Sequence, residues 1–437
     1  MRRGWSTLVL VLVFGGLVGY IYFVDAKREP GSSTAREKPF TSVQADDIEE
    51  VQIKSADGET TRLQKADGTW QLVEPVQTAA DANEMTTIAS SLASLEIQRV
   101  VDENAGDLKQ YGLEPARVEV AFRPKGEKEL KRVQIGEKTP TGNDLYARLP
   151  DQQRVFLVSS FLDTTFNKNT FALRDRRILV FDRTMVDGLE LTSGTSKTQL
   201  AKSGSEWRLA SPISARADFA AVEGALERLS STQMQGIVDP EGKNLAKYGL
   251  TKPTGGITVK TGSSNATLTL GSTENALLFA KDSSRPTVFT VAPVLKDDVI
   301  KKVVDFRRKD LFDGRAFTTA RAELKRGAET LVLEKSKGKD NADVWKSGGK
   351  DVDSAKADDV LTKVTALRAS SFEDQVHPSL KSPALVVTVS FGENKQETVT
   401  FARSGADVFA SRPDEPGSAK VEGSGLDDVM KAIDALK

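Results

Sequence analysis

The chain has 437 residues, which suggests about three domains, and its 61 Lys and Arg nearly balance its 62 Asp and Glu. This balance, together with sparse aromatics, argues against a nucleic-acid partner. The absence of cysteine excludes disulfides, thiolate nucleophiles and iron–sulfur clusters. The single histidine, His377, stands before a proline in a polar turn, and we expect an incidental surface residue rather than a metal ligand or a base.

The amino terminus begins with an uncharged, apolar segment at residues 4–24. A helix of this length spans roughly 31 Å, which matches the hydrocarbon core of a bilayer. Arg2 and Arg3 precede it, so the positive-inside rule places the amino terminus in the cytoplasm. We predict that residues 1–26 are a single-pass anchor in a bacterial inner membrane, with the bulk of the chain in the periplasm.

A cleaved signal peptide is the alternative, because Val24, Asp25 and Ala26 resemble a small-x-small cleavage site. Gly15 and Gly19 form a Gly-xxx-Gly pair, which would let a second membrane helix pack closely, although glycine is also simply common in membrane helices. Residues 27–39 are charged, rich in small residues and flanked by prolines, which predicts a flexible linker.

The rest of the chain repeats one pattern three times, beginning at a tryptophan. Trp70, Trp207 and Trp345 are separated by 137 and 138 residues. An apolar stripe at i, i+3, i+7 and i+10 follows each and predicts an amphipathic helix. Asp81 and Asp353, four residues before two of the stripes, are predicted N-caps. The stripes are Met85, Ile88, Leu92 and Leu95; Phe219, Val222, Leu226 and Leu229; and Ala357, Val360, Val364 and Leu367.

A Tyr-Gly-Leu phrase follows the helix in the first two copies, and "SLKSPALVV" stands in its place in the third. We predict a structural role, because glycine permits a positive φ while the flanking side chains pack on a sheet; the alternative is a loop that contacts a ligand. Strand-like runs come next, with Gly136 and Gly271 where a turn is expected. The phrases are Tyr111, Gly112 and Leu113, and Tyr248, Gly249 and Leu250.

Basic segments close the first two copies. We expect a solvated connector paired with neighbouring acids, and the alternative is a docking surface for an acidic partner or lipid headgroups. The arginines concerned are Arg174, Arg176, Arg177, Arg307 and Arg308.

These patterns predict an α+β protein of tandem repeats, each a mixed or antiparallel sheet with an amphipathic helix on one face. The expected repeats cover 40–180, 181–314 and, in degenerate form, 315–437, with contacts between repeats through segments near 171–183 and 303–316.

Motifs for catalysis are missing from the sequence. It contains no Gly-rich phosphate loop, no GxSxG and no HExxH. A Ser-x-x-Lys at Ser336–Lys339 falls in a Lys- and Gly-rich hairpin tip, where coincidence is the better interpretation. We therefore expect a protein that is not an enzyme and needs no cofactor or metal.

The combination of anchor and repeated phrases resembles the bacterial exported family of domain of unknown function 4340. The likeness rests on Asp67–Trp70, Pro75, Tyr111–Leu113, Ile135–Gly142, Tyr146–Arg148 and Leu173–Arg177, and it spans nearly all of residues 40–437. The resemblance implies an association with ABC-type exporters similar to the gliding-motility transporters, with a permease and an ATPase as partners. It implies no catalytic residues.

Two functions are consistent with these observations. The first is a periplasmic accessory or scaffold subunit of an ABC-type transport system, anchored beside its permease. The second is a free-standing envelope protein that acts as a spacer or binds wall polymer or a surface protein.

Overall fold

The computed structural model describes residues 36–338, 343–393 and 395–436. The predicted anchor at 1–26, including Gly15 and Gly19, lies outside the described residues, as do linker residues 27–35. Within the described part of the chain, no helix is both long and apolar enough to cross a membrane. Contacts group the chain into two compact units that divide between Arg176 and Arg177.

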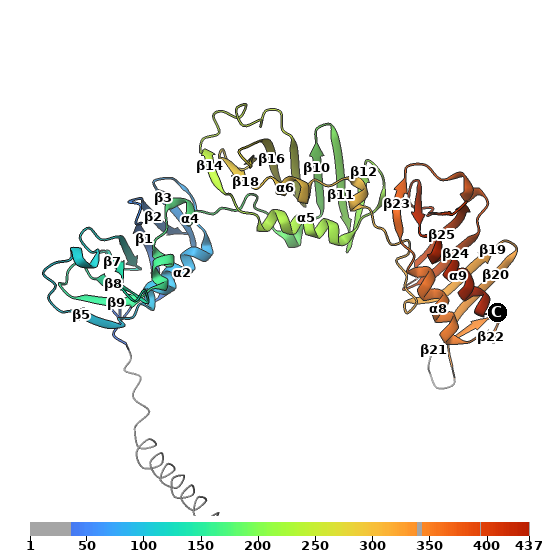
Figure 1. Ribbon diagram of the computed structural model, residues 1–437, viewed down its shortest axis with the longest axis horizontal. Coiled ribbons are helices and arrows are strands. Elements are labelled where there is room, and N and C mark those ends of the chain that lie inside the picture. The colour runs from blue at the N-terminus through green and yellow to red at the C-terminus, as the bar shows by residue number, and fades with distance from the viewer. Residues whose placement is uncertain (1–35, 339–342, 394, 437) are drawn as a thin grey trace, which may run out of the picture. The chain divides into compact units, whose positions relative to one another are not determined.

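The first unit contains a nine-stranded antiparallel sheet in the order β4-β3-β2-β1-β6-β7-β8-β9-β5, with α2 against it (Figure 1). Its strands are β1 (Ile48–Lys54), β2 (Thr60–Ala66), β3 (Thr69–Glu74), β4 (Thr78–Ala79), β5 (Arg99–Asp102), β6 (Val118–Pro124), β7 (Lys131–Lys138), β8 (Asp144–Arg148) and β9 (Val155–Ser159). Its helices are α2 (Ala82–Ala93), α3 (Phe161–Phe166) and α4 (Thr170–Leu173).

The second unit contains the second and third repeats, so the predicted boundary at 314/315 lies inside it. Its first sheet has the order β13-β12-β11-β10-β15-β16-β17-β18-β14, the order of the first unit. The elements are β10 (Gly188–Ser193), β11 (Ser196–Ser203), β12 (Glu206–Ser211), β13 (Ala215–Arg216), α5 (Phe219–Ser231), β14 (Gly236–Asp239), β15 (Gly255–Thr261), β16 (Ser264–Glu274), β17 (Leu277–Asp282), β18 (Val288–Val291), α6 (Val294–Val299) and α7 (Val303–Phe306).

The third repeat has the same strand order, β22-β21-β20-β19-β24-β25-β26-β27-β23, and α8 and α9 lie together on one face (Figure 1). Three antiparallel sheets with equal topology confirm the α+β tandem repeat. The elements are β19 (Thr319–Arg326), β20 (Glu329–Lys337), β21 (Asp343–Ser347), β22 (Lys350–Asp351), α8 (Ser354–Thr365), β23 (Ala369–Glu373), β24 (Leu385–Phe391), β25 (Lys395–Ser404), β26 (Asp407–Ser411), β27 (Ser418–Val421) and α9 (Gly423–Leu436).

The helices α2, α5 and α8, one in each repeat, begin at an aspartate whose side chain accepts backbone N–H groups of the first turn. Asp81 and Asp353 cap α2 and α8, as predicted, and Asp218 caps α5. Counted from these caps, the buried positions fall at i+4, i+7, i+8 and i+11 in all three helices. In the predicted stripe of the second helix, Val222, Leu226 and Leu229 are buried, but Phe219, at the first helical position, is 57% exposed, so this one member of the stripe was wrong.

The Tyr-Gly-Leu phrase and the glycine of the following strand are two halves of one contact. Gly112 and Gly249 have φ values of +66° and +69°. We expected turns at Gly136 and Gly271, but both lie within strands, β7 and β16, at the point where the register of the strand pair shifts. A Cβ at either position would lie 2.0 Å from the tyrosine carbonyl oxygen, so only glycine admits this approach.

The third repeat lacks both halves of this contact. Ala402, fully buried, takes the place of the strand glycine, and the β25–β26 ladder runs without a register shift. His377 takes the place of the tyrosine: its ring stacks on Phe409 at 3.7 Å, where Tyr248 packs against Phe279 at 4.9 Å in the second repeat. His377 also accepts from the N–H of Ser379, so it is a structural residue and not an incidental one.

Two further features differ from the sequence interpretation. The C-terminal helix α9 was not expected, although Leu426, Val429 and Ile433 follow a helical spacing and are buried. The end of the predicted linker is part of the first unit, because Glu37 pairs with Arg154 (Oε1–Nη1, 2.6 Å) and its carbonyl accepts from the N–H of Ile97.

We expect Gly271→Ala to lower the free energy of unfolding of the second repeat by about 1–3 kcal/mol, because the added methyl group forces the tyrosine carbonyl away from the strand. The measurement is hydrogen exchange of β16 peptides over a urea series on the full-length protein in detergent.

Gly224→Ala in α5 is the matched control, since a Cβ there meets nothing within 4 Å. It should stabilise by about 0.5–1 kcal/mol. Equal stability of Gly271→Ala and the wild type would contradict the close approach.

Candidate functional site

The three tryptophans occupy the same strand position in each repeat. Each lies directly opposite a lysine of the neighbouring strand, and the ammonium lies 4.9–6.0 Å from the indole centroid. Trp207 and Trp345 are buried, and Trp70 is half-buried. The pairs are Lys65 with Trp70, Lys202 with Trp207, and Lys335 with Trp345.

In the second and third repeats the indole also donates to an acid of the first turns of the helix. Trp207 Nε1 donates to Glu223 at 3.1 Å, and Trp345 Nε1 donates to Asp358 at 2.8 Å. Both acids lie five residues after the capping aspartate, where α2 has Thr86, whose hydroxyl donates to the Ala82 carbonyl. Trp207 and Trp345 are therefore structural residues that attach α5 and α8 to their sheets.

The arginines of the two basic segments, for which a docking surface was the alternative interpretation, lie in different environments. Arg174 and Arg177 form isolated β-bridges with Ala80 and Gln233, and Arg176 lies 5.9 Å from the Phe171 ring centroid. Arg307 is only 6% exposed, so its guanidinium is not on a docking surface. Arg308 is partly buried and pairs with Asp313 at 2.5 Å.

A connector at residues 306–311 joins the second and third repeats within the second unit. On one side the carbonyl of Phe306 accepts from the N–H of Asp218 at 2.7 Å. On the other side the N–H of Leu311 donates to the carbonyl of Leu367 at 3.2 Å, and Asp310 forms a β-bridge with Arg368. The connector is therefore hydrogen-bonded to both repeats, as we expected for the segment near 303–316.

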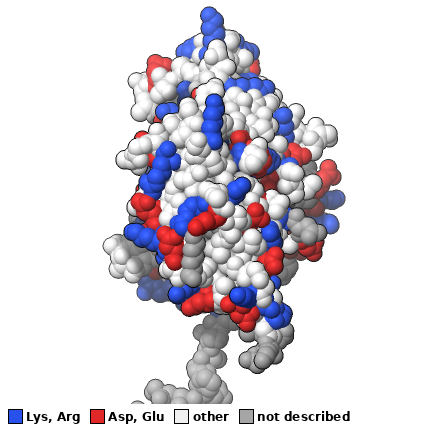
Figure 2. All heavy atoms as spheres, turned by 90° about the vertical axis from the view of Figure 1, so that its right-hand side faces the viewer, with Lys and Arg blue, Asp and Glu red and all other residues white. Residues whose placement is uncertain are grey.

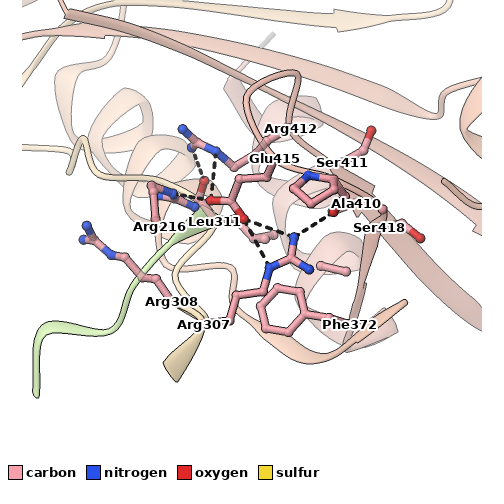
Figure 3. A pocket seen from close by; sticks show the side chains of 13 residues that line it. Arg216, Arg307, Arg308, Leu311, Phe372, Ala410, Ser411, Arg412, Glu415 and Ser418 are labelled. Atoms are coloured by element: carbon pink, nitrogen blue, oxygen red, sulfur yellow. Dashed lines mark hydrogen bonds and ion pairs between the residues drawn. The ribbon is translucent and has the colours of Figure 1, made fainter. Parts of the chain in front are cut away.

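A buried ionic cluster surrounds this connector, with Glu415 at its centre (Figure 3). We call it the ionic junction. Arg216 of β13, 4% exposed, donates from Nε to Glu415 Oε1 at 2.6 Å and from Nη1 to Asp313 at 2.9 Å. Arg307 donates to Glu415 Oε2 from the other side at 3.1 Å, and its guanidinium lies 4.0 Å from the Phe372 ring centroid.

Arg412 forms the second half of the ionic junction. Its Nη1 donates to Glu397 at 2.9 Å and to the carbonyl of Leu311 at 2.6 Å. Burial disfavours its charged form, but hydrogen bonds to Asp414 and Glu397 outweigh this and raise the pKa of Arg412. Burial opposes ionisation of Asp414 too, yet the Arg412 guanidinium lowers the pKa of that carboxyl.

The charged groups of the ionic junction are paired with one another and leave no room for a ligand larger than water. Glu397 accepts from the backbone N–H groups of Asp313 and Gly314 at 2.7–3.0 Å, so its charge is also used internally. The remaining cavity offers about 10 Å³ to the centre of a water molecule, which is room for about one water. In the described part of the chain, no three His, Asp or Glu side chains are placed to hold a metal ion.

Sequence reasoning found Arg307 and Arg308 but missed Arg216, Arg412, Glu397 and Glu415. These four residues lie in strands and loops up to 199 positions apart, and no spacing relates them. One signal was available: Arg216 stands where the first repeat has Ala79, so this charge is not part of the common pattern.

Replacing Glu415 by glutamine should destabilise the junction by about 3–5 kcal/mol, because the buried guanidinium of Arg307 loses its charge partner and that of Arg216 keeps only Asp313. Hydrogen exchange of peptides from residues 306–315, over a urea series on the full-length protein in detergent, measures this loss.

Asp359→Asn is the matched control: it removes an exposed pair with Lys363 on α8 and should change stability by at most about 0.5 kcal/mol. If the free energy of unfolding fell by the same small amount in both variants, the ionic junction would not hold the repeats together.

No curated protein matches the chain. Among solved structures it is similar to a DNA polymerase sliding clamp from Pseudomonas aeruginosa, with 11% identity over 87% of this chain and 92% of that chain and a TM-score of 0.15. It is also similar to a 6-phosphogluconolactonase, described as putative, from Bacteroides uniformis, with 10% identity over 85% and 83% and a TM-score of 0.08. At these TM-scores neither likeness carries an argument.

A family model described as domain of unknown function (DUF4340) matches residues 70–206 and 207–384. The two matches begin at Trp70 and Trp207, the same point of the first and second repeats, and together they cover well over half of the chain. By this match the chain belongs to the DUF4340 family.

Proposed function

We propose that this protein is a non-catalytic scaffold or accessory subunit of an ABC-type transport system. Residues 1–26 anchor it in the bacterial inner membrane, and the repeats lie in the periplasm. Its partners are the membrane permease and, through it, the cytoplasmic ATPase.

The ionic junction is the observation that supports a scaffold role. Buried charges are costly to desolvate and contribute little net stability, but an ion pair with several hydrogen bonds selects one arrangement of the parts that it joins. Here Arg216, Arg307 and Arg412 bind carboxylates and carbonyls across two repeats. We infer that the relative position of these repeats is itself the functional requirement.

The surface is consistent with protein contacts and not with a polyanion. On the face seen in Figure 2, Lys and Arg are interspersed with Asp and Glu, in keeping with a formal net charge of −1. A field of mixed sign favours partners with complementary local charges over nucleic acid.

The test is gentle detergent extraction of the tagged full-length protein at native expression, followed by mass spectrometry of co-purifying proteins. We expect a permease and an ATPase in constant ratio. Recovery of the protein alone, or with wall-associated proteins only, would contradict this proposal and favour the free-standing envelope spacer.

A variant with a different anchor distinguishes the role of the membrane helix from that of the repeats. Residues 1–26 are replaced by an unrelated single-pass helix, with Gly15→Leu/Gly19→Leu as a milder variant. We expect both to lose the permease while the repeats remain folded. Undiminished co-purification of the replaced anchor would show that the helix only tethers the protein.

A further inference from the structure

A groove of about 320 Å³ lies in the second repeat between the β10–β11 hairpin and the segment that joins α6 to α7. Its polar lining consists of three hydroxyl groups and two ammonium groups, and its apolar lining consists of three aliphatic side chains. The polar residues are Ser193, Ser196, Thr198, Lys301 and Lys302, and the apolar ones are Leu191, Ile300 and Val303.

In the first repeat the same region is closed by contacts within the chain. Lys168 pairs with Glu84 of α2 at 2.8 Å. The hydroxyls of Thr61 and Thr170 lie 2.7 Å apart. Asn167 Oδ1 accepts from the N–H of Ala56 in the β1–β2 turn at 2.8 Å.

The two repeats align residue by residue in this region. The α3–α4 and α6–α7 segments have equal lengths, and equivalent hydrogen bonds end α3 and α6, from Asn167 N–H to Asp163 and from Ile300 N–H to Lys296. Lys168 therefore corresponds to Lys301. Counting from the capping aspartates and from the strand pairs, Glu84 corresponds to Ala221, Thr170 to Val303, and Thr61 to Thr198.

In the second repeat the residues that correspond to Glu84 and Thr170 are Ala221 and Val303, which can form neither the ion pair nor the hydroxyl contact. Ala221 and Val303 provide neither a carboxylate nor a hydroxyl, so Lys301 and Thr198 keep their polar groups without those contacts. In the described part of the chain no carboxylate lies within 4.0 Å of the Lys301 or Lys302 ammonium. Asp305 accepts from the backbone N–H of Lys302 and forms no such pair with its ammonium.

Thr198 provides a second and independent observation. The residue is only 7% exposed and lines the groove, and its hydroxyl makes no hydrogen bond within the described residues, so this hydroxyl is open to the groove. A hydroxyl that faces a groove can exchange its hydrogen bond to water for one to a ligand oxygen.

We propose that this groove binds a tetrahedral oxyanion of the phosphate class. Two ammonium groups supply the charge, as point-charge ligands of a phosphoryl group do. The three hydroxyls donate hydrogen bonds, and Leu191, Ile300 and Val303 form the apolar part of the lining. This site goes beyond the proposed function and does not depend on a protein partner.

The test uses equilibrium dialysis of radiolabelled inorganic phosphate against the full-length protein in detergent. We expect saturable binding at one site. The double variant Lys301→Gln/Lys302→Gln should weaken binding by at least ~10-fold, since each lost charge-assisted hydrogen bond has a large effect on affinity. Absence of saturable binding by the wild type would overturn the proposal.

Two variants rebuild the closed arrangement of the first repeat. Ala221→Glu places a carboxylate where Lys301 can pair with it, and position 221 lies in the first turn of α5, where a glutamate is well tolerated. Val303→Thr gives Thr198 a hydroxyl partner. Together they should also weaken phosphate binding by ~10-fold or more, with each variant retaining its folding, and unchanged binding would contradict the site.

Lys296→Gln is the matched control, because it removes one positive charge from α6 without touching the groove. It should leave binding unchanged, and an equal loss would mean non-specific attraction. Competition with glycerol 3-phosphate distinguishes the sources of the ligand. If glycerol 3-phosphate binds more tightly than inorganic phosphate, the ligand is a phosphorylated organic group such as a lipid headgroup. If it binds more weakly, the ligand is the free anion. Either result supports the site.

Discussion

A carboxylate that is almost wholly removed from water, Glu415, holds the second unit together. Its two oxygens accept from Arg216 of one sheet and from Arg307 of the connector, so both repeats depend on the same charge. Hydrophobic packing between two sheets tolerates small displacements, whereas these bonds require the donors to be within about 3 Å and well aligned. The ionic junction therefore specifies one arrangement where apolar contacts alone would permit several.

The three repeats show how one fold accepts local substitutions when the partners of a contact change together. Gly112 occurs with Gly136, and Gly249 with Gly271, because the loop glycine and the strand glycine serve the same close approach of two backbones. In the third repeat neither glycine is present, and Ala402 fills the strand position. The comparison of the three repeats thus shows that the fold forms without the two glycines, and that only the close backbone approach requires them.

The same comparison distinguishes structural polar groups from those available to a ligand. Lys168 is neutralised by Glu84 within the first repeat, and the equivalent Lys301 is not. The ionic junction has the opposite character, because its charges are paired and its cavity holds about one water. The polar groups of the groove in the second repeat are therefore available to a ligand, whereas the charged groups at the connector bind one another.

The sequence by itself determined the repeat, the α+β class and the helix caps, because these depend on local spacing: a tryptophan every 137 or 138 residues, apolar positions at helical intervals, and Asp81 and Asp353 before two helices. Only the tertiary structure decided the ionic junction and the groove. Glu415 and Arg216 are 199 residues apart, and their contact follows from how the connector bonds to two sheets, which no local pattern encodes. The same limit explains why Gly136 resembled a turn residue: the tyrosine carbonyl that excludes a Cβ there comes from a distant loop.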